Sequence, residues 1–265
     1  EDKKLIENGK RCKVVSFANQ KGGVAKSTTC CAFASGLKKV GYRVLAIDCD
    51  PQGNLSTSVK AENNSSFTTK DVLLKKADIR EAIQSLDCFD IIPANILLAS
   101  AEVELVSEMG REQRLREAIE TVRQNYDYIC LDAPPSLGVL TINALTASDE
   151  LIIPSCADMF SASGIAQLIT TIESVKKYCN PNLKVAGILV TRYNPRTKNS
   201  KEMHSLIERF ANTLETTVFE TTIRESVVVK EAQAKQETIF DHMTSRKESA
   251  ITDYAAFVAE YLKRK

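Results

Sequence analysis

The sequence lacks several features that would indicate a membrane, a zinc site or an oxidising compartment. Its apolar runs stop well short of a membrane-spanning helix, and no apolar signal segment opens the chain. The eight cysteines include no C-x-x-C pair, and the two histidines, His204 and His242, show no zinc-type spacing. We therefore interpret the cysteines as reduced core thiols of a cytoplasmic protein.

An excess of charge of either sign is also absent. Lysines and arginines number 35 against 34 aspartates and glutamates, so the net charge is +1. This balance excludes a general attraction to DNA or to acidic membranes, and nucleic-acid binding would need a local basic patch. The composition, 43% hydrophobic and 26% charged, is that of an ordinary globular protein of 265 residues.

Short apolar segments alternate with segments of helical character along the chain. The expected strands are 12–19, 42–50, 89–94, 126–136, 150–155 and 183–193. The expected helices are 26–41, about 98–124 and 163–178, followed by a mainly helical C-terminal part with one short strand near Glu220. This order predicts an α/β fold, a doubly wound, mostly parallel sheet with helices on both faces. We expect a short extension, 1–12, and one domain over 13–265.

Polar clusters follow three of the expected strands, at 21–28, 48–52 and 132–136. Ligands of parallel sheets bind at the carboxyl ends of the strands, so three separate stretches are expected to meet at one edge. A glycine turn or an aspartate at the end of a strand is usually an ordinary structural feature. The coincidence of three clusters at one edge favours a ligand site.

The first cluster is close to the Walker A pattern, which requires Gly, four residues and Gly-Lys-Ser/Thr. Counting back from the Lys-Ser pair places Gln20 and Ala25 where the two glycines belong, and a second lysine, Lys21, precedes Gly22 and Gly23. The glycines let backbone N–H groups approach a phosphate, and the following helix adds its positive end. The candidate nucleotide ligands are Lys21, Gly22, Gly23, Val24, Ala25, Lys26, Ser27 and Thr28.

The other two clusters supply carboxylates. Lys26 can reach the β- and γ-phosphates of a nucleotide, and the Ser27 hydroxyl can ligate Mg²⁺. Asp132 is placed like a Walker B acid, which holds the metal through water. Asp48 and Asp50 add two carboxylates, one to orient the attacking water and one to tune the metal shell.

Three stretches, "KGGVAKST", "VLAIDCDPQGN" and "YDYICLDAPPSLGVLTINAL", resemble the deviant Walker A ATPases of the ParA/Soj partition type, in the MinD/ParA superfamily. The resemblance extends from about Lys13 to the C-terminus. It implies a P-loop ATPase with ATP and Mg²⁺, slow intrinsic hydrolysis and an ATP-bound homodimer. It also implies non-specific binding of double-stranded DNA, a ParB-like centromere-binding partner that stimulates hydrolysis, and a cytoplasmic, nucleoid-associated location.

The resemblance also assigns roles to single residues. Lys21 would reach across the dimer interface to the partner's ATP and act in catalysis together with Lys26 and Asp50, which is associated with activating water. The metal would be held by Ser27, Asp50 and Asp132, with Asp48 close to it. Arg224 and Ser226 belong to a loop associated with the nucleotide base.

Two departures from the family pattern bear on these roles. Ala25 stands where the family more often has glycine, and alanine restricts φ. Residues 223–226 read Ile-Arg-Glu-Ser in place of Ile-Pro-Arg-Asn, so Glu225 stands where the basic residue of that loop is expected.

The candidate DNA-contacting residues are basic side chains of the second half of the chain. They are Arg192, Arg196, Lys198, Lys201, Arg224, Lys230, Arg246 and Lys247. Acids such as Glu202 and Glu231 are interleaved with them, and an ordinary solvated surface would look similar. Too few residues precede the first strand for a helix-turn-helix domain, so we expect no sequence-specific operator binding.

Alternative functions remain open. A Min-type cell-division ATPase would need an amphipathic C-terminal helix that enters lipid; the apolar stripe in 251–262 is expected to pack on its own domain instead, so no membrane binding is expected. An ATP-dependent small-molecule synthetase would need a substrate pocket. An iron–sulfur reductase would need bridging cysteines, and Cys49 and Cys130 lack that context. The three acids argue against a non-hydrolysing scaffold.

Overall fold

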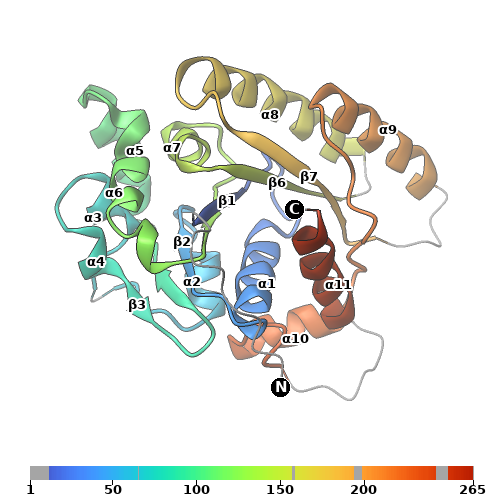
Figure 1. Ribbon diagram of the computed structural model, residues 1–265, viewed down its shortest axis with the longest axis horizontal. Helices are drawn as coiled ribbons and strands as arrows, with labels where there is room; N and C mark the ends of the chain where they lie inside the picture. Colours follow the sequence, from blue (N-terminus) through green and yellow to red (C-terminus); the bar gives the residue numbers. More distant parts are fainter. Residues whose placement is uncertain (1–11, 65, 157–158, 194–198, 243–249, 265) are drawn as a thin grey trace.

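The computed structural model describes residues 12–64, 66–156, 159–193, 199–242 and 250–264, apart from the side chains of 159–163 and 199–204. One seven-stranded sheet runs through it in the order β3-β4-β2-β5-β1-β6-β7 (Figure 1). All neighbouring strands pair in parallel except β3 and β4. The strands are β1 (Lys13–Phe17), β2 (Val44–Asp48), β3 (Gln84–Ser85), β4 (Asp90–Ile92), β5 (Tyr128–Asp132), β6 (Glu150–Cys156) and β7 (Lys184–Thr191).

Helices cover both faces of this sheet, which confirms the doubly wound α/β fold. In Figure 1, α8 and α9 lie on one side of the sheet and α1 and α11 on the other. The helices and short 3-10 turns are α1 (Lys26–Lys39), α2 (Asn54–Ser58), α3 (Thr69–Leu73), α4 (Ile79–Ala82), α5 (Leu98–Glu104), η1 (Leu105–Ser107), η2 (Arg111–Gln113), α6 (Arg114–Glu120), η3 (Arg123–Asn125), α7 (Val139–Ala147), α8 (Met159–Tyr178), α9 (Asn199–Thr213), α10 (Val227–Lys235) and α11 (Ala250–Lys263).

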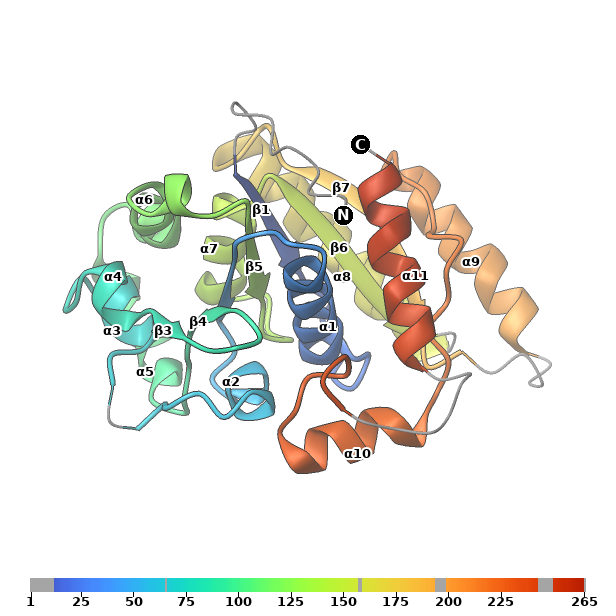
Figure 2. The ribbon, with the colours of Figure 1, turned by 60° about the horizontal axis from the view of Figure 1, so that its bottom comes forward.

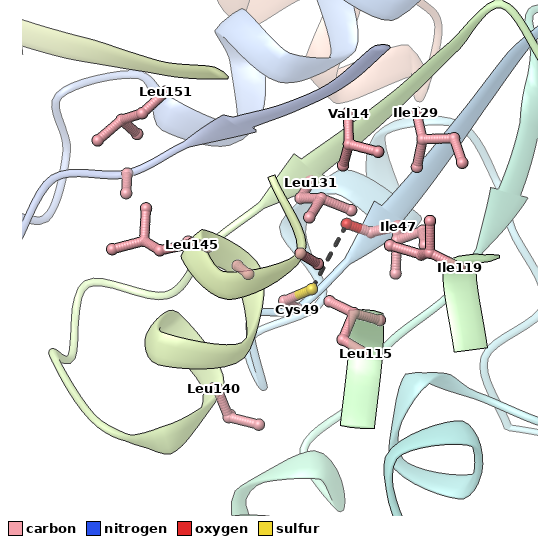
Figure 3. Close-up of a cluster of buried hydrophobic side chains, with 14 of the residues drawn as sticks. Val14, Ile47, Cys49, Leu115, Ile119, Ile129, Leu131, Leu140, Leu145 and Leu151 are labelled. Atoms are coloured by element: carbon pink, nitrogen blue, oxygen red, sulfur yellow. Dashed lines mark hydrogen bonds between the residues drawn. The ribbon is translucent and has the colours of Figure 1, made fainter. Parts of the chain in front are cut away.

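The sheet separates two apolar cores. Successive residues of β1 face opposite ways, so Val14 packs in the core under α3–α9 and Val15 packs in the core under α1, α2 and α11. Figure 3 shows part of the first core, where Ile47, Ile129 and Leu131 from the strands meet leucines of α6 and α7. Burial on both faces explains why the strands read as continuous apolar runs.

Two expected elements differ from the structure. The single long helix expected over about 98–124 is wrong, because the segment is divided into α5, η1, η2, α6 and η3. Gly110 lies at the break with φ of 67°, a left-handed conformation that a continuous right-handed helix does not contain.

The short strand expected near Glu220 is wrong as well. Among residues 199–242, the structure has only isolated bridges to this part of the sheet, at Val218 and Arg224. The backbone N–H groups of Glu220 and Thr221 donate to the two carboxylate oxygens of Glu260, each at 2.9 Å. A side chain of α11 therefore takes the donors that a strand would use.

The cysteines and the C-terminal helix are placed as expected. All eight cysteines are free, and six of them are buried. Along α11, Tyr254, Phe257, Val258 and Tyr261 are buried, so the apolar stripe packs on its own sheet. The ring of Phe33 on α1 lies edge-on to Tyr261 with centroids 4.8 Å apart, and Phe219 lies edge-on to Phe257 at 5.0 Å. Within the described residues, no helix has both the length and the apolar character needed to cross a membrane.

We expect Phe257→Ala to lower the free energy of unfolding by about 3–5 kcal/mol, because it opens a cavity where three aromatic rings meet. Chemical denaturation measures this loss. The matched control is Lys263→Ala, an exposed position of the same helix, which should stay within about 0.5 kcal/mol of the parent. Equal stability of the two variants would show that the packing of α11 adds little to the fold.

Candidate nucleotide site

The loop between β1 and α1 has the backbone shape of a phosphate cradle. Gly23 and Ala25 both lie in the left-handed region, with φ of 76° and 63°. For Ala25 this conformation costs about 1–2 kcal/mol, which glycine would avoid. Ala25 is also the N-cap of α1 and makes no side-chain cap, so the first N–H groups of the helix have no acceptor from its side chain.

The side chain of Lys26 folds back over this loop. Its Nζ donates to the backbone oxygen of Lys21 at 3.1 Å, and only 7% of the residue is exposed. Burial lowers the pKa of Lys26, while the nearby carboxylates of Asp132 and Asp50 act in the opposite direction. A buried ammonium beside two acids is placed to neutralise phosphate charge.

Parallel pairing brings two of the acids together. Asp48 at the end of β2 is in register with Asp132 at the end of β5, which is in register with Phe17 at the end of β1. The carboxylate of Asp48 accepts from the Ser56 N–H at 2.9 Å, the Ser56 hydroxyl at 2.6 Å and the Asp50 N–H at 3.1 Å. Complete burial nevertheless raises the pKa of Asp48 to about 6, because the hydrogen bonds offset only part of the desolvation.

The carboxylate of Asp132 is buried and accepts no hydrogen bond within the described part of the chain. It is fully inaccessible, and neither carboxylate oxygen has a hydrogen-bond partner among the described residues. Burial and the charge of Asp48 raise its pKa well above the usual range, and the nearby Ser27 hydroxyl and Lys26 ammonium offset part of that rise. An orphaned buried carboxylate beside a serine hydroxyl is an oxygen donor set that suits Mg²⁺.

Asp50 is the third acid of this cluster. It follows β2 and is 5% exposed, and its Oδ1 accepts from the backbone N–H of Gln52 at 2.9 Å. Its other carboxylate oxygen, Oδ2, does not take part in this hydrogen bond to Gln52. The arrangement of one buried lysine, one serine and three buried or nearly buried acids is suited to binding a metal–triphosphate complex.

Comparison with known proteins identifies the family to which the chain belongs. The AAA domain family AAA_31 matches residues 12–185. The chain is 41% identical over 223 residues to the sporulation initiation inhibitor protein Soj of Bacillus subtilis, covering 83% of this chain and 87% of Soj. It is 35% identical to the chromosome partitioning protein ParA of Myxococcus xanthus, covering 95% and 88% of the two chains. The chain belongs to the ParA/Soj family of P-loop ATPases.

Two solved structures have the same fold as this ParA/Soj chain. A cobyrinic acid a,c-diamide synthase from Mycobacterium smegmatis, with a bound ATP analogue and magnesium, superposes with a TM-score of 0.81 at 32% identity, covering 96% of this chain and 95% of the synthase. A putative plasmid partition protein from Borrelia burgdorferi bound to AMPPNP has a TM-score of 0.78 at 24% identity, covering 96% and 100%. The latter likeness shows the fold alone.

Most of the expected nucleotide residues of this ParA/Soj chain lie together. The loop 21–28 and the acids Asp48, Asp50 and Asp132 meet at the carboxyl ends of β1, β2 and β5. Ser226 caps α10, its hydroxyl accepting from the Val228 N–H at 3.2 Å. The guanidinium of Arg224 instead turns to α11, where it donates to both carboxylate oxygens of Asp253 at 2.7 and 2.8 Å.

The candidate DNA residues are only partly described. Arg192 lies beside the phosphate loop, where it donates to the Gly23 carbonyl, and Lys230 is exposed on α10. Arg196, Lys198, Arg246 and Lys247 lie outside the described residues, as does the side chain of Lys201. Their role in DNA binding stays a prediction.

Sequence analysis did not identify three residues that contact the loop or the beginning of α1. The buried amide of Asn19 donates to the Pro154 carbonyl at 2.8 Å and accepts from the Lys21 N–H at 3.1 Å, so it ties the loop to β6. Gln233 on α10 donates to the Thr28 hydroxyl at 3.0 Å, and Figure 2 shows α10 beside the beginning of α1. Thr191 donates to the Val24 carbonyl. Only Asn19, directly before the loop, carried a local signal.

We expect the nucleotide-free protein to lose stability as pH rises from 5 to 7.5. Burial raises the pKa of Asp48 from its ordinary value of 3.8 to about 6, and burial with the charge of Asp48 also raises the pKa of Asp132 well above the usual range. The native state therefore holds protons that the unfolded chain releases, so the free energy of unfolding falls through this window, by roughly 1–3 kcal/mol. Denaturant unfolding at a series of pH values, without Mg²⁺, measures it.

Asp132→Asn is the matched control, because it removes one buried charge with little change of shape. The pH-dependent loss should shrink in this variant, and its nucleotide-free form should be more stable than the parent at pH 7.5. A stability that is flat or rising between pH 5 and 7.5 in the parent would contradict the placement of these carboxyls.

Proposed function

We propose that this chain is a DNA partition ATPase. ATP with Mg²⁺ drives two copies into a sandwich dimer, the dimer binds double-stranded DNA without sequence preference, and a ParB-like partner stimulates hydrolysis to ADP and phosphate, which releases the DNA of the nucleoid. The observation that carries the proposal is the buried carboxylate of Asp132, which accepts no hydrogen bond among the described residues and lies near Lys26. Lys26 follows a loop that bears a second lysine, Lys21.

The residues present divide the chemistry between them. Mg²⁺, when bound, neutralises charge on the phosphates and orients them for attack. Ser27 and Asp132, with Asp50, would hold it, and Lys26 would contact the β- and γ-phosphates. Asp50 would also orient the attacking water, since its carboxylate lies close enough to Lys26 for their charges to interact and only its Oδ1 is used in the turn to Gln52.

Lys21 is assigned to the partner's nucleotide. It precedes the exposed Gly22 and Gly23, and its N–H is fixed by Asn19, so its position at the rim of the loop is set by buried structure. Its ammonium would act as an electrostatic clamp on charge that develops during phosphoryl transfer. The requirement for a second copy makes hydrolysis depend on dimerisation.

DNA binding by this chain would come from pairing two weak surfaces. The net charge of +1 gives one copy little general attraction to DNA. Two copies held together double the basic contacts and act with a high effective concentration. The relatives named as partition proteins support this proposal, and the change of residues 223–226 to Ile-Arg-Glu-Ser argues that the basic contacts are not those of a typical relative.

A small-molecule synthetase is the second candidate, favoured by the name of the Mycobacterium smegmatis structure. It requires a substrate pocket open to the nucleotide. The described structure has a hollow of about 530 Å³ between the end of α9 and residues 216–220, and none of the nucleotide residues lines it. A hollow that Thr28 and Gln233 help to line measures only about 20 Å³, which is room for a single water molecule. The position of the first hollow and the size of the second weigh against the synthetase, because an activated substrate must meet the γ-phosphate.

The deciding measurement is binding to a long duplex of arbitrary sequence with ATP, ADP or no nucleotide, at 50 and 200 mM salt. We expect binding with ATP only, weakened at least roughly tenfold at the higher salt because phosphate contacts release counterions. ATP binding without DNA binding would overturn the partition mechanism.

Lys21→Ala tests the dimer in the same assay. It should keep ATP binding, since Lys26 and the loop remain, but lose ATP-dependent dimerisation in sedimentation and lose DNA binding with it. Lys38→Ala, an exposed lysine at the far end of α1, is the control and should behave as the parent. A monomeric Lys21→Ala protein that still binds DNA would remove the link between dimer and DNA.

A further inference from the structure

The phosphate loop is held from outside by side chains at the ends of β6 and β7. The hydroxyl of Thr191, the last residue of β7, donates to the Val24 carbonyl at 3.0 Å. Arg192 follows it, and its Nη1 donates to the Gly23 carbonyl at 3.4 Å. The Sγ of Cys156, the last residue of β6, lies 4.0 Å from the same Gly23 oxygen. Two successive carbonyls of the loop thus face the sheet edge.

These contacts fix the direction of the N–H groups. In a trans peptide, the carbonyl of one residue and the N–H of the next point to opposite sides, and no peptide bond in the described chain is cis. A Gly23 carbonyl that faces Arg192 turns the Val24 N–H away from β7. A Val24 carbonyl that faces Thr191 does the same for the Ala25 N–H.

Arg192 is itself held in an unusual conformation. Its φ of 50° lies in the left-handed region, which costs a non-glycine residue energy and is common at functional sites. Its Nη2 donates to Glu225 Oε1 at 2.9 Å, and this contact lowers the pKa of Glu225. The next residue, Tyr193, pairs in parallel with Arg224, and its N–H donates to the Ile223 carbonyl at 2.9 Å. The backbone on both sides of the Arg192–Glu225 pair is therefore anchored.

We propose that Thr191 and Arg192 are positioning residues for the phosphate loop: they hold the Gly23–Val24 and Val24–Ala25 peptides so that both N–H groups face the β- and γ-phosphates of ATP, and Glu225 orients Arg192. This inference rests on the proposed ATP site. It gives Glu225, at the position where relatives are expected to carry a basic residue, a role inside the chain.

The proposal predicts a loss confined to phosphate recognition. Thr191→Val removes the donor from a fully buried position with nearly unchanged shape, and Arg192→Ala removes the second donor at an exposed position. Each should weaken ATP and ADP binding about five- to tenfold, the cost of one poorly fixed hydrogen-bonding group. Thr191→Ser keeps the hydroxyl and should restore binding. The melting temperature of Arg192→Ala should stay close to that of the parent.

The test is displacement of a fluorescent ATP analogue from the full chain by ATP and by pyrophosphate, which occupies only the phosphate cradle. Both competitors should weaken by the same factor in Thr191→Val and Arg192→Ala. Glu225→Ala should lower the affinity for ATP and for pyrophosphate by a smaller factor than Arg192→Ala does. The double variant Arg192→Ala/Glu225→Ala should match Arg192→Ala alone, because Glu225 acts through Arg192. Lys184→Ala, an exposed lysine at the opposite end of β7, is the control.

Three results overturn the proposal. Parent-like affinity in both Thr191→Val and Arg192→Ala shows that the loop holds itself. Weaker ATP binding with unchanged pyrophosphate binding places the effect outside the cradle. Additive losses in the double variant give Glu225 an independent role. If the parent fails to bind the analogue, the proposed ATP site fails, whereas normal parent binding with any of these three results removes only the positioning role.

Discussion

Parallel pairing of β2, β5 and β1 is the constraint on which the rest of the site depends. It aligns Asp48, Asp132 and Phe17 across one sheet edge, and the phosphate loop begins just after Phe17. Helices on both faces then exclude water from this edge, so the carboxylates are buried because the sheet is buried. The chemistry of the site follows from fixed strand order rather than from a flexible loop that gathers its ligands.

Burial gives this edge an electrostatic imbalance that ligands would correct. Two fully buried acids and Asp50 face one buried lysine, and one of the acids has no hydrogen-bond donor in the described structure. Ionised acids in such a place cost free energy until a cation arrives. A metal–triphosphate complex brings both the cation for the acids and the anion for Lys26 and the N-terminus of α1. Because the free-energy cost of the buried, ionised acids is relieved only by the cation, the site favours the metal–triphosphate complex over phosphate alone.

The two departures from the family pattern, at Ala25 and in residues 223–226, are both accommodated by contacts within this chain. Ala25 accepts the left-handed conformation that glycine would adopt freely, and contacts from neighbouring strands hold the peptides before it. Loop 223–226 has exchanged its basic residue for Glu225, which pairs with Arg192, while Arg224 pairs with Asp253. Two of the basic residues that the sequence suggested for DNA binding, Arg192 and Arg224, thus form ion pairs inside the chain.

The sequence by itself determined the alternation of strands and helices, the phosphate loop and the three acids. These features could be predicted because apolar strands and turn residues are recognised from residues adjacent in the chain. It failed at Gly110, whose left-handed conformation divides the expected long helix, and near Glu220, where Glu260 from a distant segment takes the N–H groups of the expected strand. Only the tertiary structure decided that Asp132 lacks a donor, that Ala25 is left-handed and that Thr191 and Arg192 hold the loop. Each of these depends on contacts between residues far apart in the chain, which no local pattern records.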